Sequence, residues 1–354
     1  MLFRVDASAT IGVGHLSRDL TLADALVAGG ARAVFAMAAP PDAVRRQVEH
    51  KQHALQDLAS AAGSVADLDE TIGLARRLGA SMVFVDGYQF RSAYLRGFRE
   101  HQLFACYFDD MINLRYDCHA VFNQNFFAPV ERFDRAADCE LILGPDYALV
   151  RDEFVEARAR ASGTTRAQAN RVLVTMGGAD PTGETFKCLD AFAALDPAHV
   201  GRLEVRVVVG PTNAHAAAIR ARAAASPHAI EVLENIDNMG AQLTWCDLAL
   251  TASGTTCMEL ACVGVPSLVT VVVDNQLLIG PEIDRLGLMR NLGWHAEVSA
   301  ATIGAALAEL LADRAARQEM IRRQRRCVDG AGKQRTVERL VAAFHAHAQR
   351  GTVH

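Results

Sequence analysis

The sequence predicts an α/β protein of two Rossmann-like lobes, each built on a parallel sheet with helices on both faces. Short apolar runs alternate with longer runs of helical periodicity. The alternation starts afresh at Arg171, and 354 residues exceed the comfortable size of one core. We therefore expect lobes at residues 1–155 and 171–354, joined by a linker at 156–170.

The first lobe begins with an apolar run, and further runs of strand length follow it. We expect buried strands at residues 2–5, 33–36, 82–85 and 103–108. Segments 17–28 and 65–78 carry apolar residues at helical spacing. Strands that alternate with helices favour a parallel sheet whose two faces are covered.

The second lobe repeats this pattern, with strands expected at 172–176, 203–209, 229–232, 248–251 and 267–272. The tail, residues 300–350, is rich in Ala, Arg and Glu and is helical by propensity. Part of it could return to the first lobe as a crossing helix. Two such lobes suggest the GT-B arrangement, with a ligand in the cleft between the carboxyl ends of two sheets.

Composition excludes several classes of protein. With 51% hydrophobic residues, 22% charged residues and a formal net charge of −5, the chain is globular and lacks the basic surplus of a nucleic-acid binder. Neither a signal peptide nor a membrane-spanning stretch is evident. The eight cysteines form no C-x-x-C pair and show no zinc-site spacing. We expect a cytoplasmic monomer or weak dimer, with no metal, cofactor, nucleic-acid or membrane partner.

The first strand runs into the segment DASATIGVGH, and a helix follows. Its glycines, Gly14 among them, allow close backbone approach to a ligand and present N–H groups at a helix start. No third glycine stands where a dinucleotide fingerprint requires it, and Arg18 follows instead, so that fingerprint is absent. His15 is a candidate base for a proton of water or of a sugar hydroxyl. A locally packed helix histidine is the alternative.

Polar side chains follow three apolar runs of the first lobe, namely Asp86 and Tyr88, Asp109 and Asp110, and Asn123, Gln124 and Asn125. The carboxyl ends of parallel strands are where this fold places ligand contacts. Adjacent residues of a strand point to opposite sides, so the two neighbouring aspartates are expected to hydrogen-bond and cap rather than share a metal. The amides suit sugar hydroxyl or acetamido groups. Ordinary turns are the competing interpretation throughout.

In the second lobe, Gly177 and Gly178 end the first strand, and the segment TASGTTCME runs from strand to helix. N–H groups of that helix and nearby hydroxyls could cradle a diphosphate, and Glu259 could accept hydrogen bonds from two ribose hydroxyls. A capped helix without a ligand is the alternative. Asn275 and Gln276 end a later strand, where they could face a sugar or form a surface turn.

Several segments, in this order, resemble one family. They are IGVGHLSRDL, VDGY, FDD, NQN, GPDYALVRDEF, MGGAD, TASGTTCME and VDNQ. The family is the UDP-sugar hydrolases of pseudaminic acid biosynthesis, related to a spore-coat polysaccharide protein and more distantly to MurG-type glycosyltransferases. The resemblance runs from residue 2 to residue 286. It implies metal-independent, inverting release of UDP from UDP-2,4-diacetamido-2,4,6-trideoxy-β-L-altropyranose, with the sugar held by the first lobe and UDP by the second.

The resemblance also implies roles for individual residues. His15 is the general base that activates water, and Tyr88 and Asn275 are the other catalytic positions. Sugar contacts are expected from Gly14, Arg18, Asp86, Asp110, Asn123, Asn125 and Gln276. UDP contacts are expected from Gly177, Gly178, Ile236, Met239, Ser253, Gly254, Thr255 and Glu259. Gly87 and Gln89 depart from the family's pattern around Tyr88, which bears on substrate choice.

Three alternatives stay open. A GT-B glycosyltransferase would use the same UDP-sugar chemistry but pass the sugar to an acceptor alcohol instead of water. A hydrolase of a different nucleotide-activated deoxyamino sugar would share most of the site. A non-catalytic nucleotide-sugar binder would need no base, so the joint presence of His15, Tyr88 and Asn275 argues against it.

Overall fold

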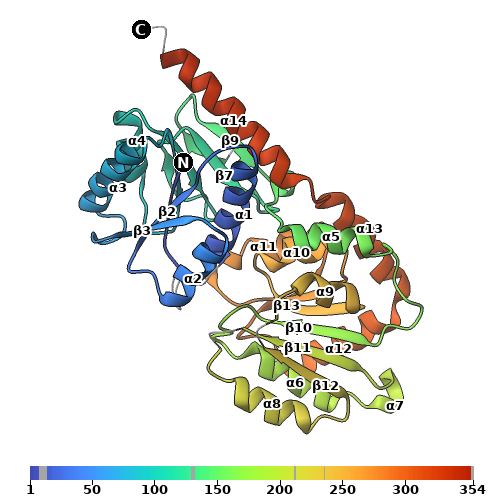
Figure 1. Cartoon of the computed structure of the whole chain (residues 1–354). Helices are drawn as coiled ribbons and strands as arrows, with labels where there is room; N and C mark the ends of the chain where they lie inside the picture. Colours follow the sequence, from blue (N-terminus) through green and yellow to red (C-terminus); the bar gives the residue numbers. More distant parts are fainter. Residues whose placement is uncertain (8–13, 129–131, 211–212, 235, 352–354) are drawn as a thin grey trace. The chain divides into compact units, whose positions relative to one another are not determined.

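The computed structural model describes residues 1–7, 14–128, 132–210, 213–234 and 236–351 (Figure 1). The chain divides into two compact units. The first consists of Met1–Leu149 together with the segment from Ala331 onward, and the second is Val150–Gly330. Both units are built on parallel sheets, as predicted. Their boundaries differ from the expected 1–155, 156–170 and 171–354.

The first unit contains a seven-stranded parallel sheet in the order β3-β2-β1-β4-β5-β7-β9, counted over the described residues. Strand order reverses between β1 and β4, which makes this pair the topological switch point. The elements are β1 (Leu2–Val5), α1 (Gly14–Ala28), β2 (Val34–Ala38), α2 (Asp42–His50), β3 (Ala54–Leu58), α3 (Val65–Leu78), β4 (Met82–Asp86), α4 (Ser92–Glu100), β5 (Phe104–Phe108), β6 (Arg115–Tyr116), β7 (Ala120–Asn123), β8 (Asp134–Arg135), β9 (Glu140–Leu143) and η2 (Pro145–Tyr147).

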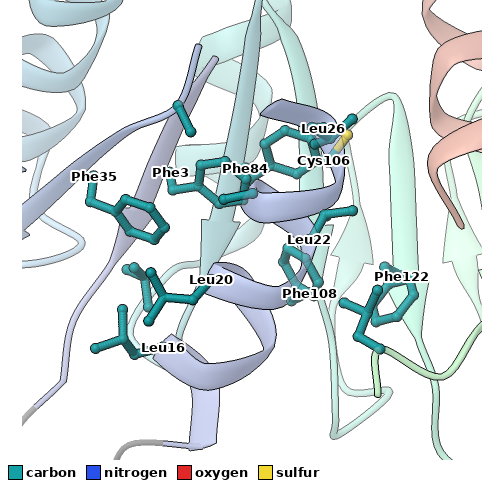
Figure 2. Close-up of a cluster of buried hydrophobic side chains, with 14 of the residues drawn as sticks. Phe3, Leu16, Leu20, Leu22, Leu26, Phe35, Phe84, Cys106, Phe108 and Phe122 are labelled. Carbon is teal, nitrogen blue, oxygen red and sulfur yellow. The ribbon is translucent and has the colours of Figure 1, made fainter. Parts of the chain in front are cut away.

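Helix α1 packs its apolar face against aromatic side chains from the sheet (Figure 2). Phe3 of β1 stacks on Phe35 of β2 and on Phe84 of β4, with ring centroids 5.0 and 4.5 Å apart. Leu22 and Leu26 of α1 belong to the same buried cluster. This packing fixes the start of α1 against the carboxyl ends of β1 and β4, where the polar residues lie.

The second unit repeats the topology with a six-stranded parallel sheet in the order β12-β11-β10-β13-β14-β15, counted over the described residues. Its switch point lies between β10 and β13. The elements are α5 (Asp152–Arg160), β10 (Arg171–Thr175), α6 (Glu184–Ala194), α7 (Pro197–Val200), β11 (Glu204–Val209), α8 (Ala216–Ala224), β12 (Ala229–Glu234), α9 (Met239–Trp245), β13 (Leu248–Ala252), α10 (Thr256–Val263), β14 (Ser267–Val271), η3 (Asp274–Gln276), α11 (Ile279–Arg285), β15 (Arg290–Trp294), α12 (Ala300–Ala312) and α13 (Arg314–Cys327).

Two segments explain the altered boundaries. The start of the expected linker, residues 156–160, lies in α5. Arg158 of this helix donates hydrogen bonds to the carbonyls of Cys262 (2.8 Å) and Arg325 (2.9 Å) within the second unit. The last helix, α14 (Gly332–Gly351), belongs to the first unit. There Thr336 donates to the Tyr147 carbonyl (3.0 Å), and Leu340 joins the core beneath α1.

Six described strands have no counterpart in the predicted set. They are β3, β6, β7, β8, β9 and β15. Strand β3 reads ALQDL and lies at the sheet edge with most residues exposed or half-buried, so it lacks an apolar run. None of the helices in the described part combines the length and apolar character needed to cross a bilayer.

Candidate functional site

Register in the first sheet aligns the polar residues that follow its strands. Val5 of β1 pairs with Asp86 of β4, and Asp86 pairs with Phe108 of β5. Phe108 in turn pairs with Phe122 of β7. Residues directly after these positions therefore lie along one edge of the sheet, centred on the β1–β4 switch point.

His15 sits in the first turn of α1, above this edge. Its Nδ1 makes a short hydrogen bond with Asp86 Oδ1, and its ring meets Tyr88 edge-on, with centroids 5.0 Å apart. Donation from Nδ1–H to a carboxylate leaves Nε2 as the proton acceptor, the arrangement of an oriented general base. The histidine is 8% exposed.

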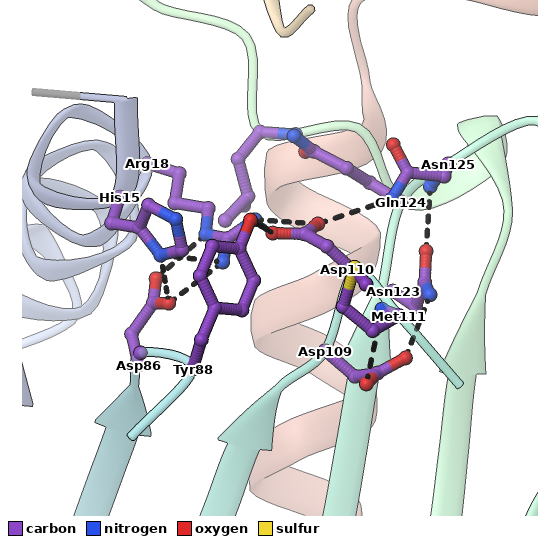
Figure 3. Close-up of polar contacts among 12 residues, drawn as sticks. His15, Arg18, Asp86, Tyr88, Asp109, Asp110, Met111, Asn123, Gln124 and Asn125 are labelled. Carbon is purple, nitrogen blue, oxygen red and sulfur yellow. Dashed lines mark hydrogen bonds and ion pairs between the residues drawn. The ribbon is translucent and has the colours of Figure 1, made fainter. Parts of the chain in front are cut away.

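Arg18, one turn later on α1, joins the carboxylates (Figure 3). It binds Asp86 through Nε (2.6 Å) and Nη2 (2.7 Å), and both oxygens of Asp110 through Nη1 (2.9 Å each). We refer to His15, Arg18, Asp86 and Asp110 as the charged cluster. Such bidentate pairs fix side-chain position as well as charge.

Electrostatics in the charged cluster keep both carboxylates ionised. Burial alone would raise the pKa of Asp86, but the guanidinium of Arg18 and the hydrogen bond with His15 hold it below its ordinary value. Burial likewise opposes ionisation of Asp110, and Arg18 and His15 again keep its pKa low. Tyr88 donates to Asp110 Oδ2 (3.3 Å), and Asn125 donates to Asp110 Oδ1 (3.0 Å). Tyr88 is 38% exposed.

Asp109 and Asn123 are occupied inside the protein. Asp109 accepts hydrogen bonds from the Ile112 N–H (3.0 Å), the Tyr116 hydroxyl (2.8 Å) and the Asn123 amide (3.0 Å). Asn123 Oδ1 also accepts from the Asn125 N–H (2.9 Å). Asn123, expected to contact the sugar, is therefore buried and hydrogen-bonded inside the protein, where it shapes the loop that carries Asn125. The expected glycine loop, residues 8–13, lies outside the described residues, and Gly14 opens α1.

The second unit places glycines at its own switch point. Gly177, after β10, has φ +84°, a conformation that favours glycine. A Cβ on Gly210, after β11, would collide with the Gly178 carbonyl and Cα. Gly210 therefore allows the β11 end to approach the Gly177–Gly178 turn closely.

After β13, residues 253–256 lead into α10. The Ser253 N–H donates to the Thr270 carbonyl (2.9 Å), and the Gly254 N–H to the Ala252 carbonyl (2.8 Å). These two N–H groups are not free, contrary to the expectation for the whole segment. Thr255 makes no side-chain cap, and within the described chain the N–H groups of Thr255 and Thr256 have no acceptor. We refer to residues 177–178 and 253–256 as the loop site.

Glu259 lies in the first turns of α10, where Arg151 reaches one of its oxygens at 3.2 Å. Burial raises the pKa of Glu259 to about 7, although Arg151 acts in the opposite direction. Arg151 also pairs with Glu153 (2.7 Å), which accepts from the Gly240 N–H (3.1 Å) at the start of α9. Sequence reasoning did not select Arg151 or Glu153, although both fall in the segment GPDYALVRDEF.

The other expected ligand residues of the second unit lie on loops and helix starts. Gln276 is 8% exposed, and its Oε1 accepts from Ser253 Oγ (3.3 Å) and the Val272 N–H (3.0 Å). Its carbonyl therefore holds the loop site in place. Asn275 lies in η3, Ile236 precedes α9, and Met239 opens that helix. His15 and Tyr88 thus belong to the first unit, and Asn275 to the second.

Comparison with known proteins agrees with this architecture. Residues 171–335 match the model of the glycosyltransferase family 28 C-terminal domain. The spore coat polysaccharide biosynthesis protein SpsG of Bacillus subtilis (strain 168) is 28% identical over 190 residues, which are 53% of this chain and 54% of that protein. The alignment thus spans about half the length of that relative.

Solved structures resemble the chain over nearly its whole length. MurG of Acinetobacter baumannii has a TM-score of 0.67 at 15% identity, covering 95% of this chain and 98% of that one. The calicheamicin glycosyltransferase CalG4 has a TM-score of 0.66 at 16% identity, covering 97% and 98%. SnogD from Streptomyces nogalater has a TM-score of 0.65 at 17% identity, with the same coverage. These likenesses confirm the predicted GT-B fold.

The expectation of a hydrolase is wrong. The matched family model and the solved structures named above are those of glycosyltransferases. Water as the nucleophile falls with that expectation, and the pseudaminic acid assignment has no support from these matches. The described residues contain no group of three or more histidine, cysteine or acidic side chains that could hold a metal ion.

Proposed function

We propose that the chain is a glycosyltransferase that passes a sugar from a nucleoside diphosphate to an acceptor hydroxyl. The observation that carries this proposal is His15, held by Asp86 so that its Nε2 can accept a proton. A hydroxyl needs such a base to attack the anomeric carbon, and a positioned histidine contributes about a hundred- to ten-thousand-fold in rate. The glycosyltransferase match of residues 171–335 supports the same activity.

The reaction divides between the units as follows. The acceptor O–H gives its proton to His15 Nε2 as the acceptor oxygen bonds to the anomeric carbon. The bond from that carbon to the phosphate oxygen breaks, and the nucleoside diphosphate leaves. The N–H groups of Thr255 and Thr256, at the positive end of α10, stabilise its charge. Glu259 accepts the ribose hydroxyls, and the exposed ring of Tyr88 lines the sugar side.

UDP is the nucleotide we propose first, because the resemblance of the loop site concerns UDP-binding segments. The spore coat relative is named for polysaccharide biosynthesis, so a saccharide acceptor is the first class to examine. The donor panel should include UDP-N-acetylhexosamines and UDP-2,4-diacetamido-2,4,6-trideoxy-β-L-altropyranose.

The test is release of UDP from each donor, with and without saccharide acceptors, together with mass spectrometry of the acceptor. We expect release that depends on an acceptor and a product heavier by one glycosyl unit. Release at an equal rate without any acceptor would contradict transfer. The His15→Ala variant should still bind UDP in calorimetry, but it should cleave UDP from the donor at least a hundredfold more slowly.

A further inference from the structure

Asp19 is a buried carboxyl beneath the charged cluster that neither the sequence analysis nor the proposed mechanism uses. It lies four residues after His15 on α1, so the two side chains share one face of the helix. Leu22 and Leu26 extend this face into the core. Asp19 is 1% exposed.

One oxygen of this carboxyl lacks the hydrogen-bond partner that a buried ion requires. Its Oδ1 has no hydrogen-bond partner among the residues that the structure describes. The adjacent Arg18 is already bound to Asp86 and Asp110. Asp6, after β1, is bound to Arg4 (2.8 Å) and Gln89 (3.0 Å).

A buried carboxylate without a partner is costly, and such a group normally stays protonated. Burial and then the negative charge of Asp86 raise the pKa of Asp19 well above its ordinary value, although Arg18 acts in the opposite direction. Asp86 differs, because its pKa is held low by Arg18 and His15 against the effect of burial. Two neighbouring carboxyls with pKa values pushed apart are typical of acid–base sites.

Charge balance gives this difference a consequence for His15. With Asp19 neutral, the charged cluster has two carboxylates and one guanidinium, so it is one positive charge short. A proton taken up by His15 supplies that charge. A third carboxylate would favour a proton on His15 before any acceptor arrived, and a protonated histidine is no base.

We propose that Asp19 is a positioning residue that acts as an uncharged acid beneath His15 and leaves Asp86 as the anion bound to the imidazole. Its ionisation sets the alkaline end of the working pH range, because ionised Asp19 competes with Asp86 for Arg18 and His15. The catalytic part of this proposal rests on the proposed function, since it takes His15 as the base. The charge state of Asp19 does not.

The first experiment is the pH profile of kcat/KM for the wild type and Asp19→Asn, with full-length protein. Asparagine keeps the shape but cannot ionise, so the alkaline fall should disappear. One pH unit above the wild-type alkaline midpoint, the variant should retain about tenfold more of its own optimum. Asp24→Asn, on the same helix but paired with Lys51 at the surface, should keep the wild-type profile. An unchanged alkaline fall in Asp19→Asn would overturn the proposal.

The second experiment needs no turnover and so separates this proposal from the proposed function. Only the wild type must take up a proton at residue 19 on folding, because the raised pKa exists in the folded state alone. Its stability should therefore fall relative to Asp19→Asn as pH rises from 5 to 8. We expect the urea midpoint of the variant to exceed that of the wild type by a margin that widens with pH. If the difference in urea midpoint instead narrows or reverses as pH rises, Asp19 is ionised and paired in the folded state, and the proposal is wrong.

Discussion

The two units share a topology but fill their switch points with opposite chemistry. Between β1 and β4, the first unit places four charged or titratable side chains that bind one another. Between β10 and β13, the second unit places glycines and backbone N–H groups. Fixed side-chain charges can hold a proton acceptor in one orientation, whereas backbone groups can accept a diphosphate without a competing counter-ion. We therefore assign proton transfer to the first unit and binding of the diphosphate charge to the second.

The largest effect is expected for His15→Ala, which tests whether the two units divide these functions. We expect kcat to fall by about a hundred- to ten-thousand-fold, because the proton acceptor is lost. UDP affinity in calorimetry should stay within twofold, since the proposed nucleotide contacts belong to the second unit. A variant with near-normal turnover would remove His15 from the chemistry, and a large loss of UDP affinity would show that the two functions are not divided as proposed.

Arg18→Met tests whether the charged cluster is held together by its one guanidinium. Asp86 and Asp110 would keep buried charge without that cation, so the free energy of unfolding should fall by about 3–5 kcal/mol. Arg45→Met is the matched control. Arg45 pairs with Asp57 at the surface (2.8 Å), where such a pair contributes about 0–1 kcal/mol. Equal losses in urea unfolding of the two variants would contradict the special position of Arg18.

Sequence reasoning selected residues at the strand ends of both sheets, but it did not predict how these side chains pair with one another. Asp86, Asp110 and Asn125 were expected at strand ends because strand ends are visible as apolar runs followed by polar residues. Asn123 hydrogen-bonds to Asp109, and Gln276 hydrogen-bonds to Ser253. These pairs join segments that are distant in sequence, so a sequence pattern does not reveal them. Asp19 lies inside a helix of ordinary sequence pattern, so only the burial of its carboxyl and the unpartnered Oδ1 distinguish it. Edge strand β3 was missed because its side chains are mostly exposed or half-buried.

Gly210→Ala tests whether the loop site depends on backbone placement. The added Cβ would collide with the Gly178 backbone, so the Gly177–Gly178 turn must shift. We expect a loss of about 1–3 kcal/mol in UDP binding or in stability, the usual cost of overpacking. Gly304→Ala is the control, since its Cβ would meet neighbours at ordinary contact distances of 3.9 Å and more. Calorimetry that shows the same UDP affinity for wild type and Gly210→Ala, with equal stability, would argue against a close fit there.

The smallest expected effect concerns Glu259, the carboxyl group in the first turns of α10. Only its ionised form accepts hydrogen bonds from two ribose hydroxyls, and burial raises its pKa to about 7. UDP affinity should therefore fall as pH drops below about 7, with no such fall in Glu259→Gln. The variant should bind about tenfold more weakly than the wild type above that pH, since one hydrogen bond to a charged group contributes about 1.5–3 kcal/mol. Calorimetry between pH 6 and 8 checks both points, and identical pH profiles would place the ribose elsewhere. In that case the nucleotide would be bound without a charged side chain of α10, and the two switch points would differ in chemistry even more than proposed.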